Sequence, residues 1–514
     1  MPQGDNRRAM NGPQRIELPA TDWPLHDSAS SRRIEAAASA LLPPHALMQR
    51  AGAAVAKLAL ALAPHAERVW IAAGPGNNGG DGFEAALHLQ RAGKQVQVSV
   101  FGDATRRPAD ASAALARAQA AGVAIEVGLP AEIQADLAID ALLGLGLTRA
   151  AQGELAAAIQ QLNGLTVPRL AVDLPSGLDG DHGVALGGIA ATASHTLALL
   201  TLKPGLFTAH GRDHAGVVWF DDLDVAGTAA MHPPRAWLGG GAAALQLRPP
   251  RRHGQHKGSF GDVIVVGGAA GMAGAVLLAG RAALAAGAGR VYVCAFDPDA
   301  RSFDPLWPEL MLRPGLWHDA RAVQNASVVC GCGGGDAVRE ALPPLLARAP
   351  RLVLDADALN AIAADSALQT LLAARAVRGQ PTVLTPHPLE AARLAGIDGA
   401  AAVQANRLGV AEQLAARFGC VVVLKGSGSV IAAPQQLSVI NPSGNARLAS
   451  AGTGDVLAGW LGGLWAAAQA QALAPSASSV ARAATWLHGA AAEGGDELVP
   501  LTASALLRRL ASQG

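Results

Sequence analysis

The 514-residue chain has little cysteine, no net charge and no long uninterrupted apolar run. Four cysteines are too few for a disulfide framework in a chain of this length. The 40 basic and 40 acidic residues cancel, which argues against a nucleic acid or an anionic membrane held through bulk charge. The N-terminus lacks the basic, apolar and cleavage-site order of a signal peptide. We therefore expect a cytoplasmic protein whose partners are small molecules, with neither nucleic acid nor membrane among them.

Two apolar stretches, residues 263–280 and 456–480, are interrupted by glycines, and the second also by two glutamines and a proline. A membrane span would be more uniformly apolar over about 20 residues, so both stretches predict buried elements of folded domains. Cys330 and Cys332 are separated by one residue, a spacing that fits no common metal site, and we interpret them as small loop residues.

The composition that is present indicates a folded α/β protein. Apolar residues make up 50% of the chain and charged residues 16%, which argues against long disorder. The length predicts two or more domains, and short apolar runs alternate with Ala/Leu-rich helical patterns, as in parallel sheets. The periodicity lapses around residues 225–245. We predict one domain over 1–240, with a disordered tail over 1–20, and a second over 241–514.

The predicted elements follow from these runs. Helices are predicted over residues 46–62, 84–92 and 274–286. Strands are predicted over residues 69–73, 95–101, 137–143, 170–174, 196–202, 263–266, 290–295, 327–330, 352–355, 382–384 and 421–424.

A glycine-rich segment at residues 74–82, GPGNNGGDG, follows a predicted strand and opens a helix. It satisfies the G-x-G-x-x-G fingerprint of dinucleotide binding, and Asp103 ends the next strand, where a ribose-binding acid would lie. Its asparagines and Asp81 are able to bind a cation as well as a phosphate. The alternative is a tight turn between strand and helix.

Polar side chains also follow the next strands of this half. Asp140 ends a strand before a second glycine loop, and Ser176 lies in the DLPSGL segment. Strand ends converge on one crevice in doubly wound sheets, so Asn78, Asp140 and Ser176 together favour a site for one hard cation. Taken singly, each fits a turn or a helix cap.

Five motifs of this half occur in the order LMQRAG, GNNGGDG, DALLGLG, DLPSGL and LKPG. Together they resemble the NAD(P)H-hydrate epimerase domain over roughly residues 30–225. The resemblance implies a Rossmann-like fold and a potassium ion held by Asn78, Asp140 and Ser176. It implies that the hydrate is bound by Asn77, Asn78, Gly79, Gly80, Asp81, Gly144, Leu145, Gly146, Leu147, Thr148, Arg149, Ala150 and Asp173. Gln49 departs from the glutamate usual in the family.

The implied reaction interconverts the R and S epimers of hydrated NADH or NADPH at C6, a hemiaminal carbon. Epimerisation requires reversible bond breaking there, through ring opening or loss of the hydroxyl, with acid–base assistance. Asp173 is the first candidate for that role. Lys203 is the second, and it could equally be a structural ion-pair partner.

The most informative segment of the second half is ASAGTGDVLAG at residues 449–459. Small residues lead to Asp455 at a predicted helix start, where backbone amides hold anions. Asp455 would there take a proton from a hydroxyl that meets a phosphoryl group. The alternative is a helix N-terminus with aspartate in its first turn.

Three further segments of this half carry chemistry. Asp355 and Asp357 follow a strand and favour Mg²⁺ or substrate binding, or turn and cap roles. His387 lies between prolines at a strand end, which favours a functional role. Residues 425–429, KGSGS, resemble a phosphate- or nucleotide-binding turn without the Walker A pattern.

The motifs HKG, PELM, DADALN, TPHPLE, LKGSG and GTGD occur in this order. They resemble the ADP-dependent NAD(P)H-hydrate dehydratase domain, a ribokinase-like α/β fold, over about residues 245–510. The resemblance implies ADP with Mg²⁺ and hydrate binding by Ala275, Gly333, His387 and Asp455. It implies nucleotide contacts from Lys425, Gly426, Ser427, Gly428, Ser429 and Gly454. Two departures are GCGGG at 331–335, where the family has GPGLG, and Arg447, where glycine is frequent.

The combined expectation is a bifunctional metabolite-repair enzyme, an isomerase followed by a lyase, acting on NADHX, NADPHX and ADP as a homo-oligomer. ADP would phosphorylate the C6 hydroxyl, leaving AMP, and elimination of phosphate would restore NAD(P)H, with Asp455 as the base. One alternative is a ribokinase-like small-molecule kinase fused to an NAD-binding domain. Another is a nucleotide-sensing first half without catalysis.

Overall fold

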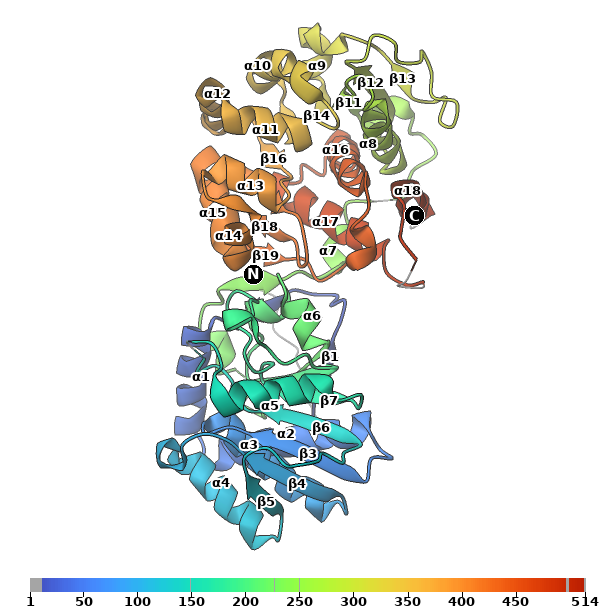
Figure 1. Ribbon diagram of the computed structural model, residues 1–514. Helices are drawn as coiled ribbons and strands as arrows, with labels where there is room; N and C mark the ends of the chain where they lie inside the picture. The colour runs from blue at the N-terminus through green and yellow to red at the C-terminus, as the bar shows by residue number, and fades with distance from the viewer. Residues whose placement is uncertain (1–11, 148, 226, 249, 496–498, 513–514) are drawn as a thin grey trace. The chain divides into compact units, whose positions relative to one another are not determined.

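The computed structural model describes residues 12–147, 149–225, 227–248, 250–495 and 499–512. The chain divides into two compact units, drawn in Figure 1. The first holds Pro24–Ala236 and the segment that ends at Glu17, and the second holds Leu18–Trp23 and Trp237–Gly514. Within the second unit, Asp22 accepts hydrogen bonds from the Gly240 amide at 2.8 Å and from Arg482 at 2.7 Å.

The first unit is built on an eight-stranded sheet in the order β1-β9-β8-β7-β6-β3-β4-β5. Every neighbouring pair is parallel except β1 with β9. The strands are β1 (Gln14–Ile16), β3 (Arg68–Ala73), β4 (Gln95–Val100), β5 (Ala124–Val127), β6 (Leu137–Ala141), β7 (Arg169–Val172), β8 (His195–Leu199) and β9 (Val217–Asp221). Residues 14–16 therefore form an edge strand, although the sequence predicted disorder through residue 20.

Helices cover both faces of this sheet because its central strands are apolar on both sides. In β3, Val69 and Ile71 pack into one core cluster with α2 and α3, while Trp70 packs into a second cluster with α5. This alternation follows from the two-residue period of a strand. The helices are α1 (Ser28–Ala40), α2 (Ala46–Leu62), α3 (Asn77–Arg91), α4 (Ala109–Ala120), α5 (Gly153–Gly164) and α6 (Gly211–Ala215).

The second unit is built on an 11-stranded sheet in the order β13-β12-β11-β14-β15-β16-β17-β18-β19-β10-β2. The run from β13 to β17 is parallel, and β18 is antiparallel to both neighbours. The strands are β2 (Trp23–Leu25), β10 (Ala236–Leu238), β11 (Asp262–Gly267), β12 (Arg290–Ala295), β13 (Met311–Leu312), β14 (Ala326–Cys330), β15 (Arg351–Leu354), β16 (Thr382–Leu384), β17 (Val421–Leu424), β18 (Val430–Ala432) and β19 (Val439–Ile440). The two sheets confirm the predicted α/β class.

Helix α16 (Thr453–Ala470) lies beside α8 (Ala273–Ala285) in the second unit (Figure 1). Glycines allow this close approach, because a Cβ at Gly459 would lie 1.9 Å from the Ala279 carbonyl oxygen and one at Gly463 would lie 2.3 Å from that of Ala283. The remaining helices are α7 (Ala242–Leu245), α9 (Ala320–Gln324), α10 (Val338–Arg348), α11 (Ala356–Ala364), α12 (Ser366–Val377), α13 (Pro388–Ala395), α14 (Gly399–Ala405), α15 (Arg407–Phe418), α17 (Ala477–Ala490) and α18 (Ala503–Ser512). Of the helices described, none is long and apolar enough to cross a membrane.

Each sheet has one point where its strand order reverses. In the first unit the chain runs outward from β3 to β5 on one side and from β6 to β9 on the other. In the second unit the same reversal falls between β11 and β14. Ligands of open α/β sheets bind outside the carboxyl ends of the strands at such a point. The loops after β3, β6, β11 and β14 are therefore the places to look for sites.

Candidate functional site

The predicted loop at residues 74–82 is shorter than its composition indicated. Only Gly74–Gly76 form the turn, because α3 begins at Asn77 with Gly76 as its N-cap. A Cβ at Gly79 would lie 2.0 Å from the Gly74 carbonyl oxygen, and one at Gly80 would lie 2.6 Å from Met48. Both glycines are therefore required by the close packing at the start of α3.

Two cavities meet at the point where the strand order of the first unit reverses. One has a volume of about 110 Å³ and the other of about 760 Å³. Of the predicted site residues, the smaller is lined by Asn77, Asn78, Asp81, Gly144, Leu145 and Asp173. The larger is lined by Asn77, Asn78, Gly144, Leu145, Gly146, Leu147, Arg149 and Ala150. Thr148 lies outside the described residues.

Asp173 and Lys203 form a buried ion pair beside the smaller cavity. The Lys203 ammonium donates to Asp173 Oδ1 and also to the Leu199 carbonyl at 3.2 Å. Lys203 is fully buried, whereas 12% of the Asp173 side chain is exposed. Asp173 has a left-handed backbone (φ 65°), a conformation that residues other than glycine adopt mainly where the surrounding structure imposes it. The carboxylate is thus held at the cavity wall by a lysine that itself has no access to solvent.

Three further carboxyl groups, Glu35, Asp81 and Asp110, line the same small cavity, and the sequence analysis overlooked Glu35 and Asp110. Glu35 comes from α1, and Asn77 donates a long hydrogen bond of 3.5 Å to its Oε1. Burial and the charge of Asp173 raise the pKa of Glu35. Burial raises the pKa of Asp81 well above its ordinary value, and Glu35 and Asp173 add to that rise. The cavity therefore holds two groups whose pKa is raised, Glu35 and Asp81, beside two paired carboxylates, Asp173 with Lys203 and Asp110 with His45.

Asp140 and Ser176 are joined directly, as expected for residues at neighbouring strand ends. The Ser176 hydroxyl donates to Asp140 Oδ1 at 2.5 Å and its amide to Oδ2 at 2.8 Å. Burial raises the pKa of Asp140 to about 6. The Leu143 amide donates to the Ser176 hydroxyl at 2.8 Å, and a Cβ at Gly144 would lie 3.4 Å from Asn78. The loop after β6 therefore links all three predicted ligands.

These three residues fit a potassium ion by their chemistry. The side-chain nitrogen of Asn78 is buried without a hydrogen-bond partner among the described residues. Asp140 receives its hydrogen bonds from neutral groups, namely Ser176 and the Leu142 amide. A weakly held cation would supply the positive charge that neutral donors lack, and oxygen ligands suit such a cation.

The site of the second unit is centred on Asp355 at the end of β15. Lys425, which follows β17, donates to Asp355 Oδ1 at 2.7 Å, and the Thr385 hydroxyl donates to the same oxygen at 2.9 Å. Asp355 Oδ2 lies 3.8 Å from the position that a Cβ at Gly454 would take, and Lys425 Nζ lies 3.3 Å from it. Because Gly454 has no side chain, both charged groups are able to lie close to the N-terminus of α16.

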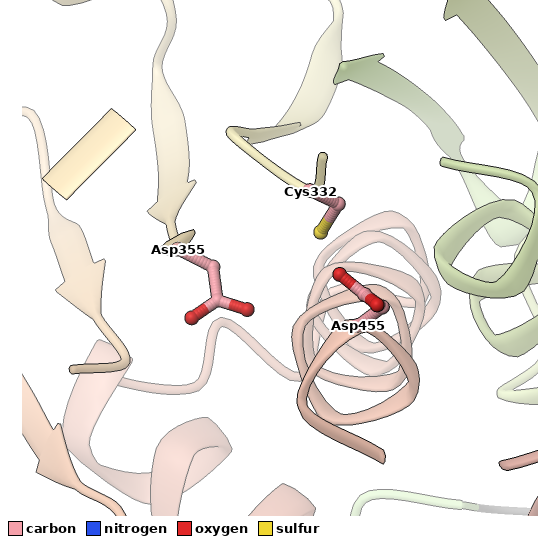
Figure 2. Close-up of side chains that lie close together, drawn as sticks. All are labelled: Cys332, Asp355 and Asp455. Carbon is pink, nitrogen blue, oxygen red and sulfur yellow. The ribbon is translucent and has the colours of Figure 1, made fainter. Parts of the chain in front are cut away.

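Cys332, Asp355 and Asp455 converge from three elements, as Figure 2 shows. The Cys332 Sγ and one carboxylate oxygen from each aspartate lie within 4.8 Å of one another. Burial and the charge of Asp355 raise the pKa of Asp455 to about 6, and a hydrogen bond with the Cys332 thiol lowers it. The interpretation of Cys330 and Cys332 as loop residues was therefore incomplete, since Cys330 ends β14 and Cys332 contacts the predicted catalytic aspartate.

The first turn of α16 is fixed from both sides. Gly452, its N-cap, has a left-handed backbone (φ 86°). The Thr453 hydroxyl lies 2.9 Å from the carbonyl oxygens of Leu448 and Ser450. His488 Nε2 donates to the Thr453 carbonyl at 2.9 Å, and burial lowers the pKa of this imidazole to about 4, so it is neutral. The amides before Asp455 are therefore held at a set position.

His387 caps α13 and lies at the edge of this site. Its Nδ1 accepts from the Leu389 and Glu390 amides at 3.1 and 3.3 Å, and its Nε2 lies 3.2 Å from Glu390 Oε1. Burial and the nearby Lys425 lower the pKa of His387, while burial raises that of Glu390 to about 7. His387 thus has a structural role as a cap, and 47% of its side chain is exposed to solvent.

The other predicted residues of this half fall into two groups. Ala275 lies against Gly333, whose Cβ would be 2.9 Å from that of Ala275. Of residues 425–429, Lys425 donates to Asp355. The buried Arg407 donates to the carbonyl oxygens of Lys425 and Gly428, and the Asn441 amide donates to the Ser429 carbonyl at 2.8 Å, so the backbone of this loop is fixed.

Two family models match this chain. The model described as NAD(P)H-hydrate dehydratase matches residues 263–506, and the model described as YjeF-related protein N-terminus matches residues 44–205. The bifunctional NAD(P)H-hydrate repair enzyme Nnr of Escherichia coli K12 is 35% identical over 496 residues, which cover 93% of this chain and 90% of the relative. The enzyme of the same name from Moorella thermoacetica is 36% identical over 477 residues, covering 84% and 83%.

Among solved structures, the chain is similar to the ADP/ATP-dependent NAD(P)H-hydrate dehydratase of Bacillus subtilis co-crystallised with ATP and Mg²⁺. The identity is 28% and the TM-score 0.43, with 53% of this chain and 96% of that one covered. The relatives in sequence extend over both units and over nearly their own full length. The chain belongs to the family of bifunctional NAD(P)H-hydrate repair enzymes.

Proposed function

We propose that the first unit interconverts the R and S epimers of hydrated NADH and NADPH, and that the second dehydrates the S epimer with ADP, releasing AMP and phosphate. The observation that carries this proposal is that each unit has its own cluster of buried polar groups at the carboxyl ends of its parallel strands, at or next to the point where the strand order reverses. The fusion is chemically sensible, because the first reaction supplies the epimer that the second consumes.

In the first unit, the small cavity would hold the hydrated nicotinamide ring and the larger cavity the rest of the dinucleotide. The larger volume lies within the range of ligand pockets of roughly 300–1,000 Å³. Asp173 would exchange a proton with the C6 hydroxyl, and Lys203 would hold its carboxylate in place. Potassium held by Asn78, Asp140 and Ser176 would fix the loop after β6, which lines both cavities.

In the second unit, Asp455 would accept the proton of the C6 hydroxyl as that oxygen attacks the β-phosphoryl group of ADP. The amides of the first turn of α16 would stabilise charge on the phosphoryl oxygens. Lys425 and the loop to Ser429 would bind the nucleotide. Magnesium carried with ADP would neutralise phosphate charge, and Asp355 fits it because both hydrogen bonds described for this residue fall on Oδ1, which leaves Oδ2 for a hard cation.

The test is to incubate the purified chain with a mixture of both NADH hydrate epimers, ADP, Mg²⁺ and K⁺. Recovery of NADH absorbance with one AMP per NADH, and disappearance of both epimers, would support the proposal. An Asp173→Asn variant should consume only the S epimer. A stable phosphorylated metabolite would instead favour the kinase alternative, and an unchanged R-epimer rate in Asp173→Asn would favour a sensing role for the first unit. We also propose a cytoplasmic homo-oligomer, whose mass light scattering would measure.

A further inference from the structure

A second carboxyl group stands beside Asp173 where the two cavities of the first unit meet. Glu35 is the only carboxylate common to the residues described as lining both cavities. It is half-buried and lies on α1, well before the glycine motifs. Its Oε1 accepts from the Asn77 amide at the start of α3. The group is therefore oriented toward the ligand space by a residue of the predicted binding turn.

The two carboxyl groups differ in their surroundings. Lys203 donates directly to Asp173 Oδ1 and forms a buried ion pair with it. Among the described residues, Glu35 has no such ion pair. Burial and the charge of Asp173 raise its pKa, and the charges of Lys203 and Arg32 and the hydrogen bond from Asn77 act in the opposite direction. A carboxyl group whose surroundings favour its proton, beside a second carboxyl group that is held in an ion pair, is an arrangement suited to acid–base catalysis.

We propose that Glu35 is the catalytic acid that works with Asp173 in epimerisation, an inference that rests on the epimerase function proposed above. Asp173 takes the proton of the C6 hydroxyl, the C6–N1 bond breaks as the C6 carbonyl forms, and Glu35 gives its proton to N1. Rotation about the C5–C6 bond presents the other face of the carbonyl. Ring closure returns one proton to each carboxyl group, so that the cycle conserves protons and electrons.

Asp81 is the competing candidate, since its pKa is also raised in the small cavity. It lies in the buried first turns of α3 and lines the smaller cavity, whereas Glu35 also lines the larger one. A proton on Glu35 is therefore able to exchange with solvent through the larger cavity between turnovers. Position, and not acidity alone, distinguishes the two groups.

The decisive variant is Glu35→Gln, because the amide oxygen still accepts from Asn77 while the group no longer transfers a proton. The R-to-S rate, measured after subtraction of the enzyme-free rate, should fall by about 100-fold or more, with the KM for the hydrate unchanged. The wild-type rate should decline as the pH rises through the raised pKa of Glu35, and this decline should be absent from the residual rate of the variant. Dehydration of pure S epimer by the same preparation should be unaffected, which shows that the loss is confined to epimerisation.

Asp110→Asn is the matched control, because Asp110 lines the same cavity but its Oδ1 is paired with His45 Nδ1. It should retain the wild-type rate. If Glu35→Gln epimerises at full speed while the wild type is active, the inference is wrong and the epimerase function stands. A loss that appears only as a higher KM, with the pH profile kept, overturns the acid role in favour of positioning Asn77. If the wild type itself does not epimerise, the proposed function fails.

Discussion

The pH dependence of dehydration should report directly on the environment of Asp455. As the base of the proposed reaction, this carboxyl must be ionised to act. Burial, with a contribution from Asp355, raises its pKa to about 6, while the Cys332 thiol and Lys425 act in the opposite direction. Because the pKa is raised, activity should be lost as the pH falls through about 6, and not near the ordinary aspartate value.

The expected size of the loss follows from the titration curve. With a pKa of about 6, roughly 99% of Asp455 is ionised at pH 8 and roughly 9% at pH 5. The rate should therefore fall about tenfold between these two values. An aspartate with an ordinary pKa would still be roughly 90% ionised at pH 5, and its rate would hardly change.

The assay is the initial rate of NADH formation from pure S hydrate with saturating ADP and Mg²⁺. Ionisation of ADP itself would also reduce the rate in acid, so the variant Cys332→Ala serves to separate the two causes. It removes the hydrogen bond that lowers the pKa of Asp455 and should move the acidic decline to higher pH. Cys332→Ser keeps a donor and should resemble the wild type. A flat profile from pH 5 to 8, or a decline that is identical in all three proteins, would refute the reasoning.

Three other perturbations test the framework of the sites. Gly459→Ala places a methyl group against a carbonyl of α8 and should lower the free energy of unfolding by about 1–3 kcal/mol in urea titrations, whereas Gly274→Ala, where the space is open, should not. Lys425→Met leaves the buried carboxylate of Asp355 without its ion-pair partner. The variant should lose about 3–5 kcal/mol of stability and show a higher KM for ADP. Potassium at 100 times its Kd should stabilise the wild type by about 2.7 kcal/mol, and thermal melts of Asp140→Asn should not respond to it.

The regular elements of this chain could be predicted well because their apolar periods are long and strong. The helix predicted over residues 46–62 is α2, and the strands predicted over 290–295 and 421–424 are β12 and β17 with the same bounds. These segments are apolar on the faces that become buried, so hydrophobic patterning and tertiary packing agree. The short strands β18 and β19 carry only three and two residues, too few to establish a period.

The sites were less predictable than the elements, for two physical reasons. Asn77 to Gly82 contain glycine and asparagine, which disfavour helices, yet packing against β3 and α2 makes them the first turns of α3. Glu35 and Cys332 carry no local signature, because their roles arise from neighbours far along the chain. Lys203 was left open between an acid–base group and an ion-pair partner, and its bond to Asp173 is the ion pair.

The short segment Leu18–Trp23 has a practical consequence for anyone who separates the two activities. Because Asp22 of this segment bonds to Gly240 and Arg482, the dehydratase unit is assembled from two discontinuous pieces of chain, with Pro24–Ala236, the larger part of the epimerase unit, inserted between them. A single cut after Ala236 would therefore release an epimerase fragment that still carries a piece of its neighbour, and a dehydratase fragment that lacks it. Gene fission at that position would require the missing peptide to be supplied in trans, which ties the two reactions to one polypeptide by architecture as well as by chemistry.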